Sequence, residues 1–474
     1  MPSKVVKGTF WSAFERFSVQ GISFVVQIVL ARLLVPKDYG LVGMLVVFLS
    51  ISQSFIDSGF STALIQKKNA SNKDFSTVFY FNVVVSIVLY WILYAAAPFI
   101  AHFYHQPLLK DILRISGLTL IINSFAVVQR TILTIKIDFK TQSRASFTAA
   151  IISGAVAICL AYYGLGVWAL VVQTLISAII NCVLLHVFSK WHPFWYFSLD
   201  RLRNLFKFGV NILISGLVYT LYGQLYILII GKKFKANDLG CYTRADQFYS
   251  FPSSNICEIL KRVYFPALCQ IRDDKEHLIS AYRKSLKASA LIVFPLMMLF
   301  AAISEPLIRI VLTDKWLGVV WMLQLLCFRG MLFPVTTLNL NVLNVIGRSD
   351  VFLKVQLYTH AIAIMVVCLL AVWADITMLI ICQIVIVYIM LGIGSIYVNK
   401  YIGYSIFNLI KDLKGVFLLS IITGSIAYWV ISFFTIPVLQ LMVGVGVFLL
   451  MFLSLAWILN VADIRLIKVQ LLKK

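Results

Sequence analysis

Charged and amide side chains recur at helical spacing inside long apolar stretches of this chain. The clearest such face consists of Arg244, Phe248, Phe251, Asn255, Glu258 and Arg262, at steps of three or four residues. Those steps place the side chains on one side of a helix. A charge at the centre of a bilayer costs about 2.5–3.5 kcal/mol on insertion scales. These residues therefore need either a protein partner or a water-filled cavity.

Three further stretches carry polar faces of the same kind. They consist of Arg16, Gln20, Ser23 and Gln27; of Ser50, Gln53, Asp57 and Ser61; and of Asn211, Ser215, Tyr219, Tyr222 and Tyr226. We interpret the four faces as the lining of one central aqueous cavity. The alternative is that the same side chains pair between helices and only hold a bundle together.

The cavity interpretation defines two sets of candidate residues. The candidate substrate-binding residues are Arg16, Gln20, Asn211, Tyr222, Arg244, Asn255, Lys261, Arg262 and Arg329. The carboxylates that could couple transport to H⁺ or Na⁺ are Glu15, Asp57 and Glu258. An arginine can bind a phosphate group through two parallel hydrogen bonds. The tyrosines and phenylalanines could stack on sugar rings, although packing alone explains most aromatic residues in so apolar a chain.

No catalytic residue is predicted, because the chain contains no nucleophile elbow, phosphate loop or other catalytic signature. His102 and His105 are three residues apart and could share a metal ion. No cysteine or well-placed carboxylate completes a ligand set for them. We therefore expect neither a metal site nor a resident cofactor. The eight cysteines form no CxxC pair and are expected to be free thiols.

The elements that must position these residues are membrane-spanning helices. Hydrophobic residues make up 61% of the 474 and charged residues 13%, about half the charged share of a soluble domain. Apolar runs of roughly 20 residues, the length that spans a bilayer, recur along the chain. They are too long and too uniform for barrel strands. The sequence predicts an all-α polytopic membrane protein with about fourteen transmembrane helices. We place them at 10–33, 40–62, 77–101, 109–134, 145–163, 167–188, 208–230, 241–264, 286–304, 318–343, 352–373, 376–398, 414–434 and 438–460.

The distribution of charge supports this count. Most of the 41 lysines and arginines fall on alternate connections, which the positive-inside rule assigns to the cytoplasm together with both termini. The same rule explains the net charge of +22 without a nucleic acid partner. No small-residue cleavage site follows the first apolar stretch, so we expect no signal peptide.

An internal repeat divides the chain. Asp38 and Gly40, at the end of the first span, recur as Asp238 and Gly240 at the end of the seventh. A second echo aligns Pro98 with Pro306. We predict two pseudo-symmetric six-helix lobes at 1–203 and 204–400, with two accessory transmembrane helices and a basic cytoplasmic tail at 401–474. A parallel repeat of this kind implies a two-fold axis along the membrane normal and a cavity between the lobes.

Three segments carry a resemblance to a known family: KGTFWSAFERF (7–17), LARLLVPKDYGLVGM (30–44) and DSGFSTALIQKK (57–68). They resemble the polysaccharide-transporter branch of the multidrug/oligosaccharidyl-lipid/polysaccharide flippase superfamily, above all Wzx-type flippases and colanic-acid or teichuronic-acid exporters. The likeness extends over about residues 1–400 and is most specific in the first sixty-odd residues. It implies two lobes around a V-shaped, cationic cavity with alternating access. Arg16, Lys261 and Arg262 fit a cationic cavity, whereas Glu15, Asp57 and Glu258 depart from it.

The resemblance implies a flippase of the bacterial inner membrane rather than an enzyme. Its expected substrate is undecaprenyl diphosphate carrying an oligosaccharide, the repeat unit of an O-antigen, capsule or exopolysaccharide. Expected partners are membrane lipid and, further, glycan polymerase and chain-length proteins. Three alternatives stay open: an ion-coupled multidrug or metabolite exporter of the same fold, a membrane glycan polymerase or glycosyltransferase, and a scaffold for glycan assembly. The polymerase would need a large outer loop with catalytic acids, and every predicted outer loop is short.

Overall fold

The computed structural model describes residues 19–57, 59–67 and 70–458, and over these residues the chain is helical with no strand. A short apolar helix, Val19–Leu33, comes first. The helices after it are α2 (Pro36–Asp57), α3 (Phe60–Gln66), α4 (Asn72–Phe103), α5 (Leu109–Ser116), α6 (Leu118–Ile135), α7 (Phe139–Tyr162), α8 (Val167–Ser189), α9 (Leu199–Lys233), α10 (Ala236–Gln270), α11 (Lys275–Ala302), α12 (Ser304–Val311), α13 (Gly318–Val345), α14 (Ser349–Leu370), α15 (Ile376–Ile402), α16 (Ile406–Ile431) and α17 (Pro437–Ile458).

These helices confirm the all-α membrane fold. Within the described ranges, 11 helical segments are long and apolar enough to cross a membrane. The helices α9 and α10, with 35 residues each, lie where the seventh and eighth spans were predicted. Of the first predicted span, only the part from Val19 onward lies within the described residues.

Two predicted spans are interrupted rather than continuous. The second span divides into α2 and α3, and Gly59 between them has a φ of 68°, a left-handed conformation that favours glycine. The fourth span divides at Gly117 into α5 and α6. Pro98 lies near the end of the long helix α4, and Pro306 lies in the short helix α12, which directly follows α11. The alignment of these two prolines stays a prediction.

The repeat at residues 38–40 and 238–240 is confirmed in atomic detail. The backbone N–H of Val35 donates to Asp38 Oδ2 at 3.2 Å, and that of Lys235 donates to Asp238 Oδ2 at the same distance. Each aspartate thus satisfies a free N–H where its helix begins. The first turns of α2 and α10 then cross with almost no space between their backbones.

Glycine makes this crossing possible. A Cβ atom added to Gly40 would overlap the carbonyl oxygen of Ala236, and one added to Gly240 would overlap that of Pro36. The contacts are reciprocal, as expected of two equivalent segments that meet about a local two-fold axis. Small residues permit such close approach of helices in membranes.

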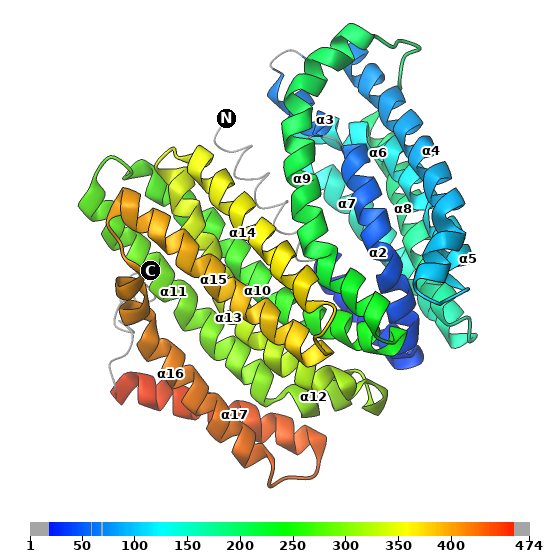
Figure 1. Cartoon of the computed structure of the whole chain (residues 1–474). Coiled ribbons are helices and arrows are strands. Elements are labelled where there is room, and N and C mark those ends of the chain that lie inside the picture. The colour runs from blue at the N-terminus through cyan, green and yellow to red at the C-terminus, as the bar shows by residue number, and fades with distance from the viewer. Residues whose placement is uncertain (1–18, 58, 68–69, 459–474) are drawn as a thin grey trace. The chain divides into compact units, whose positions relative to one another are not determined.

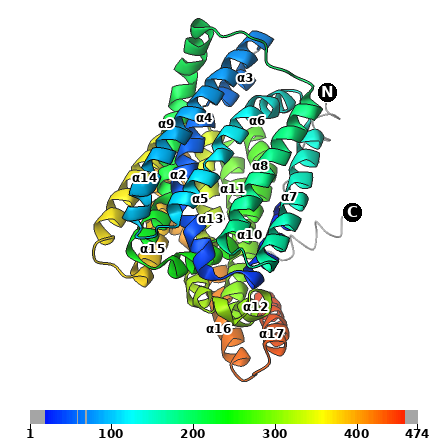
Figure 2. The ribbon, with the colours of Figure 1, turned by 90° about the vertical axis from the view of Figure 1, so that its right-hand side faces the viewer.

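The chain forms two compact units, Met1–Gly240 and Cys241–Lys474. In the first, α9 packs along α2 and also contacts α3 and α4, and Figure 1 shows α9 beside α2. The helices α6, α7 and α8 lie side by side in Figure 2. The predicted lobe boundaries at 203 and 400 come from the sequence repeat and remain predictions. A helix can belong to one repeat by its sequence and still pack against helices of the other repeat.

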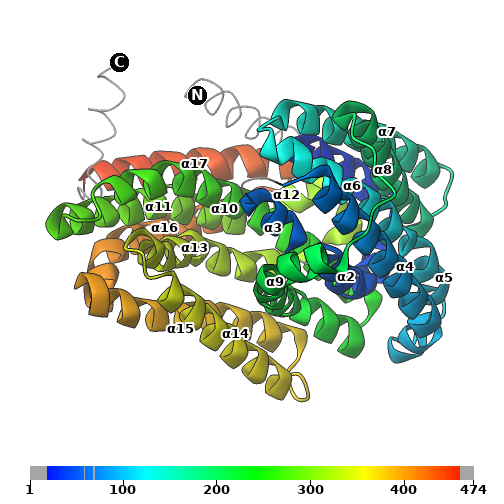
Figure 3. The ribbon, with the colours of Figure 1, turned by 90° about the horizontal axis from the view of Figure 1, so that it is seen from above.

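In the second unit, α13 packs between α11 and α15. The last two helices continue this unit, with α16 against α11 and α17 against α12 (Figure 3). A buried polar chain fastens three helices together: the Tyr282 hydroxyl donates to Asn339 Oδ1 at 2.6 Å, and Asn339 Nδ2 donates to Ser395 Oγ at 3.2 Å. Because each member has a partner, the chain stabilises one specific packing of α11, α13 and α15.

In each unit, ion pairs join one end of a helix to a neighbouring helix. The carboxylate of Asp74 accepts from Lys67 Nζ at 2.8 Å and from an Arg201 nitrogen at 2.9 Å, and so links the start of α4 to α9. In the second unit, the Arg283 guanidinium on α11 donates to both carboxylate oxygens of Asp412 on α16, at 2.7 and 2.8 Å. The hydroxyl of Tyr404 also donates to Asp412, at 2.9 Å. Burial raises the pKa of Tyr404, so this hydroxyl keeps its proton.

Candidate functional site

The first unit contains two polar pockets. The first, which we call the α2–α9 pocket, has a volume of about 440 Å³. Its polar lining comes from α2, α6 and α9 and consists of Ser50, Gln53, Ser54, Asp57, Thr119, Asn123, Tyr219, Thr220 and Gln224. The prediction that Ser50, Gln53 and Asp57 share one face is confirmed, because all three line this pocket.

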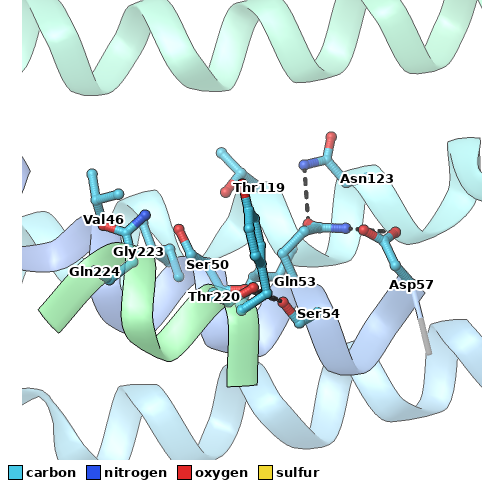
Figure 4. Close-up of a pocket in the computed structure, with 13 residues that line it drawn as sticks. Val46, Ser50, Gln53, Ser54, Asp57, Thr119, Asn123, Thr220, Gly223 and Gln224 are labelled. Atoms are coloured by element: carbon cyan, nitrogen blue, oxygen red, sulfur yellow. Dashed lines mark hydrogen bonds between the residues drawn. The ribbon is translucent and has the colours of Figure 1, made fainter. Parts of the chain in front are cut away.

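A chain of hydrogen bonds runs across the α2–α9 pocket (Figure 4). The amide nitrogen of Asn123 donates to Gln53 Oε1 at 3.4 Å, and the amide nitrogen of Gln53 donates to Asp57 Oδ1 at 3.2 Å. Ser54 Oγ and Thr220 Oγ1 lie 3.0 Å apart and join α2 to α9. The opposite charge that acts on Asp57 is that of Arg130, on α6. The predicted carboxylate is thus held in place by the Gln53 amide, which is itself held by Asn123.

The second pocket, which we call the α8 pocket, has a volume of about 560 Å³. Eleven of its lining side chains are polar and neutral: Ser23, Gln27, Ser116, Thr119, Asn123, Ser146, Ser153, Gln173, Thr174, Ser177 and Asn181. The other lining residues are alanine, valine, leucine and isoleucine. Ser23 and Gln27 belong to the polar face predicted on the first span, and that face does line a cavity.

The two pockets adjoin each other. Val46, Leu49, Thr119 and Asn123 line both. On the far side of the α8 pocket, the Gln27 amide approaches Gln173 Oε1 at 3.5 Å. The first unit therefore holds a polar region that extends from α9 past α2 and α6 to α8. In ligand-binding proteins, pockets of about 300–1,000 Å³ are typical.

In the second unit, Arg329 lies against α10. One of its terminal nitrogens donates to the Tyr249 hydroxyl at 2.6 Å and lies 3.5 Å from Asp246 Oδ1. The side chain of Arg329 is 22% exposed and that of Asp246 40% exposed. Sequence reasoning singled out Arg329 but did not connect it with Asp246. The arginine charge is therefore partly balanced within the unit.

The polar face of α10 has mixed surroundings. Phe248 is buried in packing contacts. Asn255 is buried too, and its amide nitrogen donates to the Phe251 carbonyl at 2.7 Å. Glu258 pairs with Lys261 at 3.8 Å on the same helix.

The remaining candidates divide by what the structure describes. Arg16 and Glu15 lie outside the described residues, as does the side chain of Asn211. Gln20, Tyr222 and Arg244 are half-buried, on the Val19–Leu33 helix, α9 and α10 respectively, and Arg262 is exposed on α10. None of these four is among the residues that line the α2–α9 pocket or the α8 pocket.

Sequence reasoning missed the polar residues of α6, α7 and α8. Their signal was present: Gln173, Ser177 and Asn181 follow one another at steps of four residues, as one helical face does. The signal is weak because serine and threonine in apolar helices commonly bond to their own backbone. Charged residues also gave no indication of the α8 pocket, because none is among the described residues that line it.

A family described as "Polysaccharide biosynthesis protein" matches residues 29–321. Among curated relatives, a "Teichuronic acid biosynthesis protein", TuaB of Bacillus subtilis, is 27% identical over 355 residues, 74% of each chain. The "Succinoglycan biosynthesis transport protein" ExoT of Rhizobium meliloti is 24% identical over 70% of this chain and 68% of its own. The "Lipopolysaccharide biosynthesis protein" WzxC of Escherichia coli is 23% identical over 75% and 73%.

Solved structures match the fold. The "Lipid II flippase MurJ" in an inward closed conformation superposes with a TM-score of 0.74 at 15% identity, and the match covers 96% of this chain and all of that one. An inward-facing "multidrug resistance MATE family transporter" superposes with a TM-score of 0.60 at 15% identity, over 82% of this chain and 98% of that one. The chain therefore has the fold of these multi-pass membrane proteins.

Proposed function

Since this chain belongs to the polysaccharide biosynthesis protein family, we propose that it is a flippase for polyprenyl-diphosphate-linked oligosaccharides. It moves the repeat unit of an O-antigen, capsule or exopolysaccharide across the bacterial inner membrane by alternating access. The observation that carries the proposal is the polar region inside the first unit, enclosed by helices of membrane-spanning length. Such a region in an apolar bundle serves a polar solute, because polar groups at that depth are otherwise costly.

The proposed mechanism assigns separate tasks to charged and neutral side chains. The prenyl tail stays in lipid while the headgroup enters the protein. Arg16, Lys261 and Arg262, with Arg329 positioned by Tyr249, compensate the diphosphate. Amides and hydroxyls hold the sugars. Movement of the two lobes then changes the side of the membrane to which the headgroup is accessible.

Coupling to an ion gradient is assigned to carboxylates and requires no resident cofactor. Asp57 is the strongest candidate for binding H⁺ or Na⁺, because it lines the α2–α9 pocket. It accepts a hydrogen bond from the Gln53 amide, which in turn accepts one from the Asn123 amide. Glu258 and Glu15 are further candidates. Protonation or cation binding at Asp57 would change the balance of charge with Arg130 and so favour one state of the transporter.

We further propose that both termini are cytoplasmic and that the protein acts beside a glycan polymerase and chain-length proteins. The protein performs no covalent step, and the proposal involves no nucleic acid. A multidrug exporter would select organic cations by carboxylates. That function is not favoured by the α8 pocket, since no ionisable side chain is among the described residues that line it.

The cationic residues provide the direct test. The double substitution Arg16→Ala and Arg262→Ala is expected to reduce surface polysaccharide about tenfold or more in the native host. Each lost charge-assisted hydrogen bond to phosphate is worth about 1.5–3 kcal/mol. Lipid-linked repeat units should accumulate in the inner leaflet. Surface polysaccharide is measured in a deletion strain that carries the variant gene, with protein abundance determined by immunoblot.

Arg272→Ala is the matched control, because Arg272 is an exposed arginine whose nearest acid, Asp273, is itself 95% exposed. It should leave polysaccharide at the wild-type level. If the double variant matched the control at equal abundance, the diphosphate would not be recognised by these cations. If deletion of the gene itself changed no surface glycan, the flippase assignment would fail.

A further inference from the structure

The chemistry of the α8 pocket indicates which part of the substrate it takes. Among the described residues that line it, the 11 polar side chains are hydroxyls and amides, and none is Asp, Glu, Lys, Arg or His. A diphosphate in such a place would lack cations, and an organic cation would lack carboxylates. Burying either charge without a partner is costly. The lining therefore selects a neutral ligand with many hydrogen-bonding groups.

Three hydroxyls of the pocket donate to backbone carbonyls and so are left as acceptors toward a ligand. Thr174 Oγ1 donates to the Val171 carbonyl at 2.8 Å, and Thr119 Oγ1 donates to the Ser116 carbonyl at 2.6 Å. Ser153 Oγ lies 3.4 Å from the Ala150 carbonyl in the same arrangement. A hydroxyl that has donated its single proton still offers lone pairs. These oxygens can accept hydrogen bonds from a ligand that brings its own O–H donors.

The amides complete the pattern with donors and acceptors. The amide of Asn123 lies where the two pockets adjoin, and the amide of Gln173 lies in the lining of the α8 pocket. The side-chain oxygen of Asn181 is buried and has no hydrogen-bond partner among the described residues. An unpaired buried acceptor costs about 1–3 kcal/mol, which a bound O–H group would recover. The apolar walls, including Val26, Leu45 and Leu170, suit the C–H faces of a ring.

We propose that the α8 pocket is a carbohydrate subsite, in which neutral sugar residues of the lipid-linked oligosaccharide bind inside the first unit. This inference rests on the proposed function and deepens it. The subsite recognises the glycan by hydrogen bonds from hydroxyls and amides, and no aromatic ring is among the described residues of its lining. Asn123, which lines both pockets, connects bound sugar to the Gln53–Asp57 pair.

The test removes hydrogen-bonding groups while retaining their volume. Thr174→Val with Asn181→Leu changes two lining residues of α8. Thr131→Val is the matched control: Thr131 Oγ1 donates to the Val127 carbonyl at 2.9 Å in the same way, but Thr131 lines neither pocket. The full chain is purified in nanodiscs. Two probes are compared by native mass spectrometry, undecaprenyl diphosphate and the lipid-linked oligosaccharide fraction extracted from the deletion strain.

Wild-type protein is expected to prefer the sugar-bearing lipid by about tenfold or more, which corresponds to about 1.4 kcal/mol. The α8 double variant should lose that preference while binding undecaprenyl diphosphate as the wild type does, and Thr131→Val should keep it. Retention of the preference by the double variant would overturn the subsite. So would wild-type stabilisation by Na⁺ or an organic cation that the double variant abolishes. If wild-type protein bound neither lipid and restored no glycan, the proposed function itself would fail.

Discussion

Gly40→Ala is expected to destabilise the protein by about 2 kcal/mol, although it adds only one methyl group. The added carbon would overlap the carbonyl oxygen of Ala236 at the crossing of α2 and α10. Overpacking of a tight contact costs about 1–3 kcal/mol, and backbone atoms cannot move aside as a flexible side chain can. Gly240→Ala should act in the same way, through the Pro36 carbonyl. The measurement is thermal unfolding of the purified protein in detergent.

Gly216→Ala is the matched control for this experiment. Gly216 lies within α9, and a Cβ added there would meet no atom within 4 Å. Alanine is favoured over glycine in a helix by up to about 1 kcal/mol, so this variant should be as stable as the wild type or more so. The double variant Gly40→Ala with Gly240→Ala should lose less than the sum of the two losses, because both act on one crossing. Strict additivity would show that the two glycines do not share a contact.

Asp74→Asn is expected to cost about 2 kcal/mol and to loosen the start of α4. The carboxylate of Asp74 is almost fully buried and faces two cations, Lys67 and Arg201, at 2.8 and 2.9 Å. It also accepts from the backbone N–H of Ser71 at 2.9 Å. Removing the charge of a buried pair costs about 3–5 kcal/mol, reduced here because the two cations are partly exposed to solvent. Thermal unfolding and limited proteolysis of the 67–71 segment measure the effect.

Asp350→Asn tests whether the burial of Asp74 is the cause of the stability that its ion pairs contribute. Asp350 accepts from Arg348 at 2.9 Å, as Asp74 does from Arg201, but both side chains of this pair are about half exposed. An exposed pair contributes little, so this variant should unfold at the wild-type temperature. Equal losses in the two variants would contradict the assignment of stability to the buried position of Asp74.

The two destabilising variants also bear on function. The Gly40 crossing joins segments that match in sequence and in capping geometry, and Asp74 ties α9 to α4. Variants at either place change how helices of the first unit are held, while the lining of its two pockets stays intact. A loss of polysaccharide export in these variants at normal abundance would therefore report on conformational change rather than on substrate contact.

The sequence by itself determined the helices, the membrane and the repeat. Long apolar runs leave the backbone no choice other than helix in lipid. The pair Asp38 and Asp238 predicted equivalent places in a repeat, and in the structure each aspartate caps the start of a helix in the same way. The polar faces of the first and second spans were also readable, since helical spacing fixes the direction in which side chains on one helix point.

Only the tertiary structure decided which faces meet. Spacing gives a direction on a helix but not the neighbouring helix in that direction, so the sequence did not show that Gln173 and Asn181 of α8 would share a pocket with Gln27. It likewise did not show that Arg329 would donate to Tyr249, or that α9 would pack along α2. These contacts join residues far apart in the chain, and they depend on the packing of whole helices rather than on any local pattern.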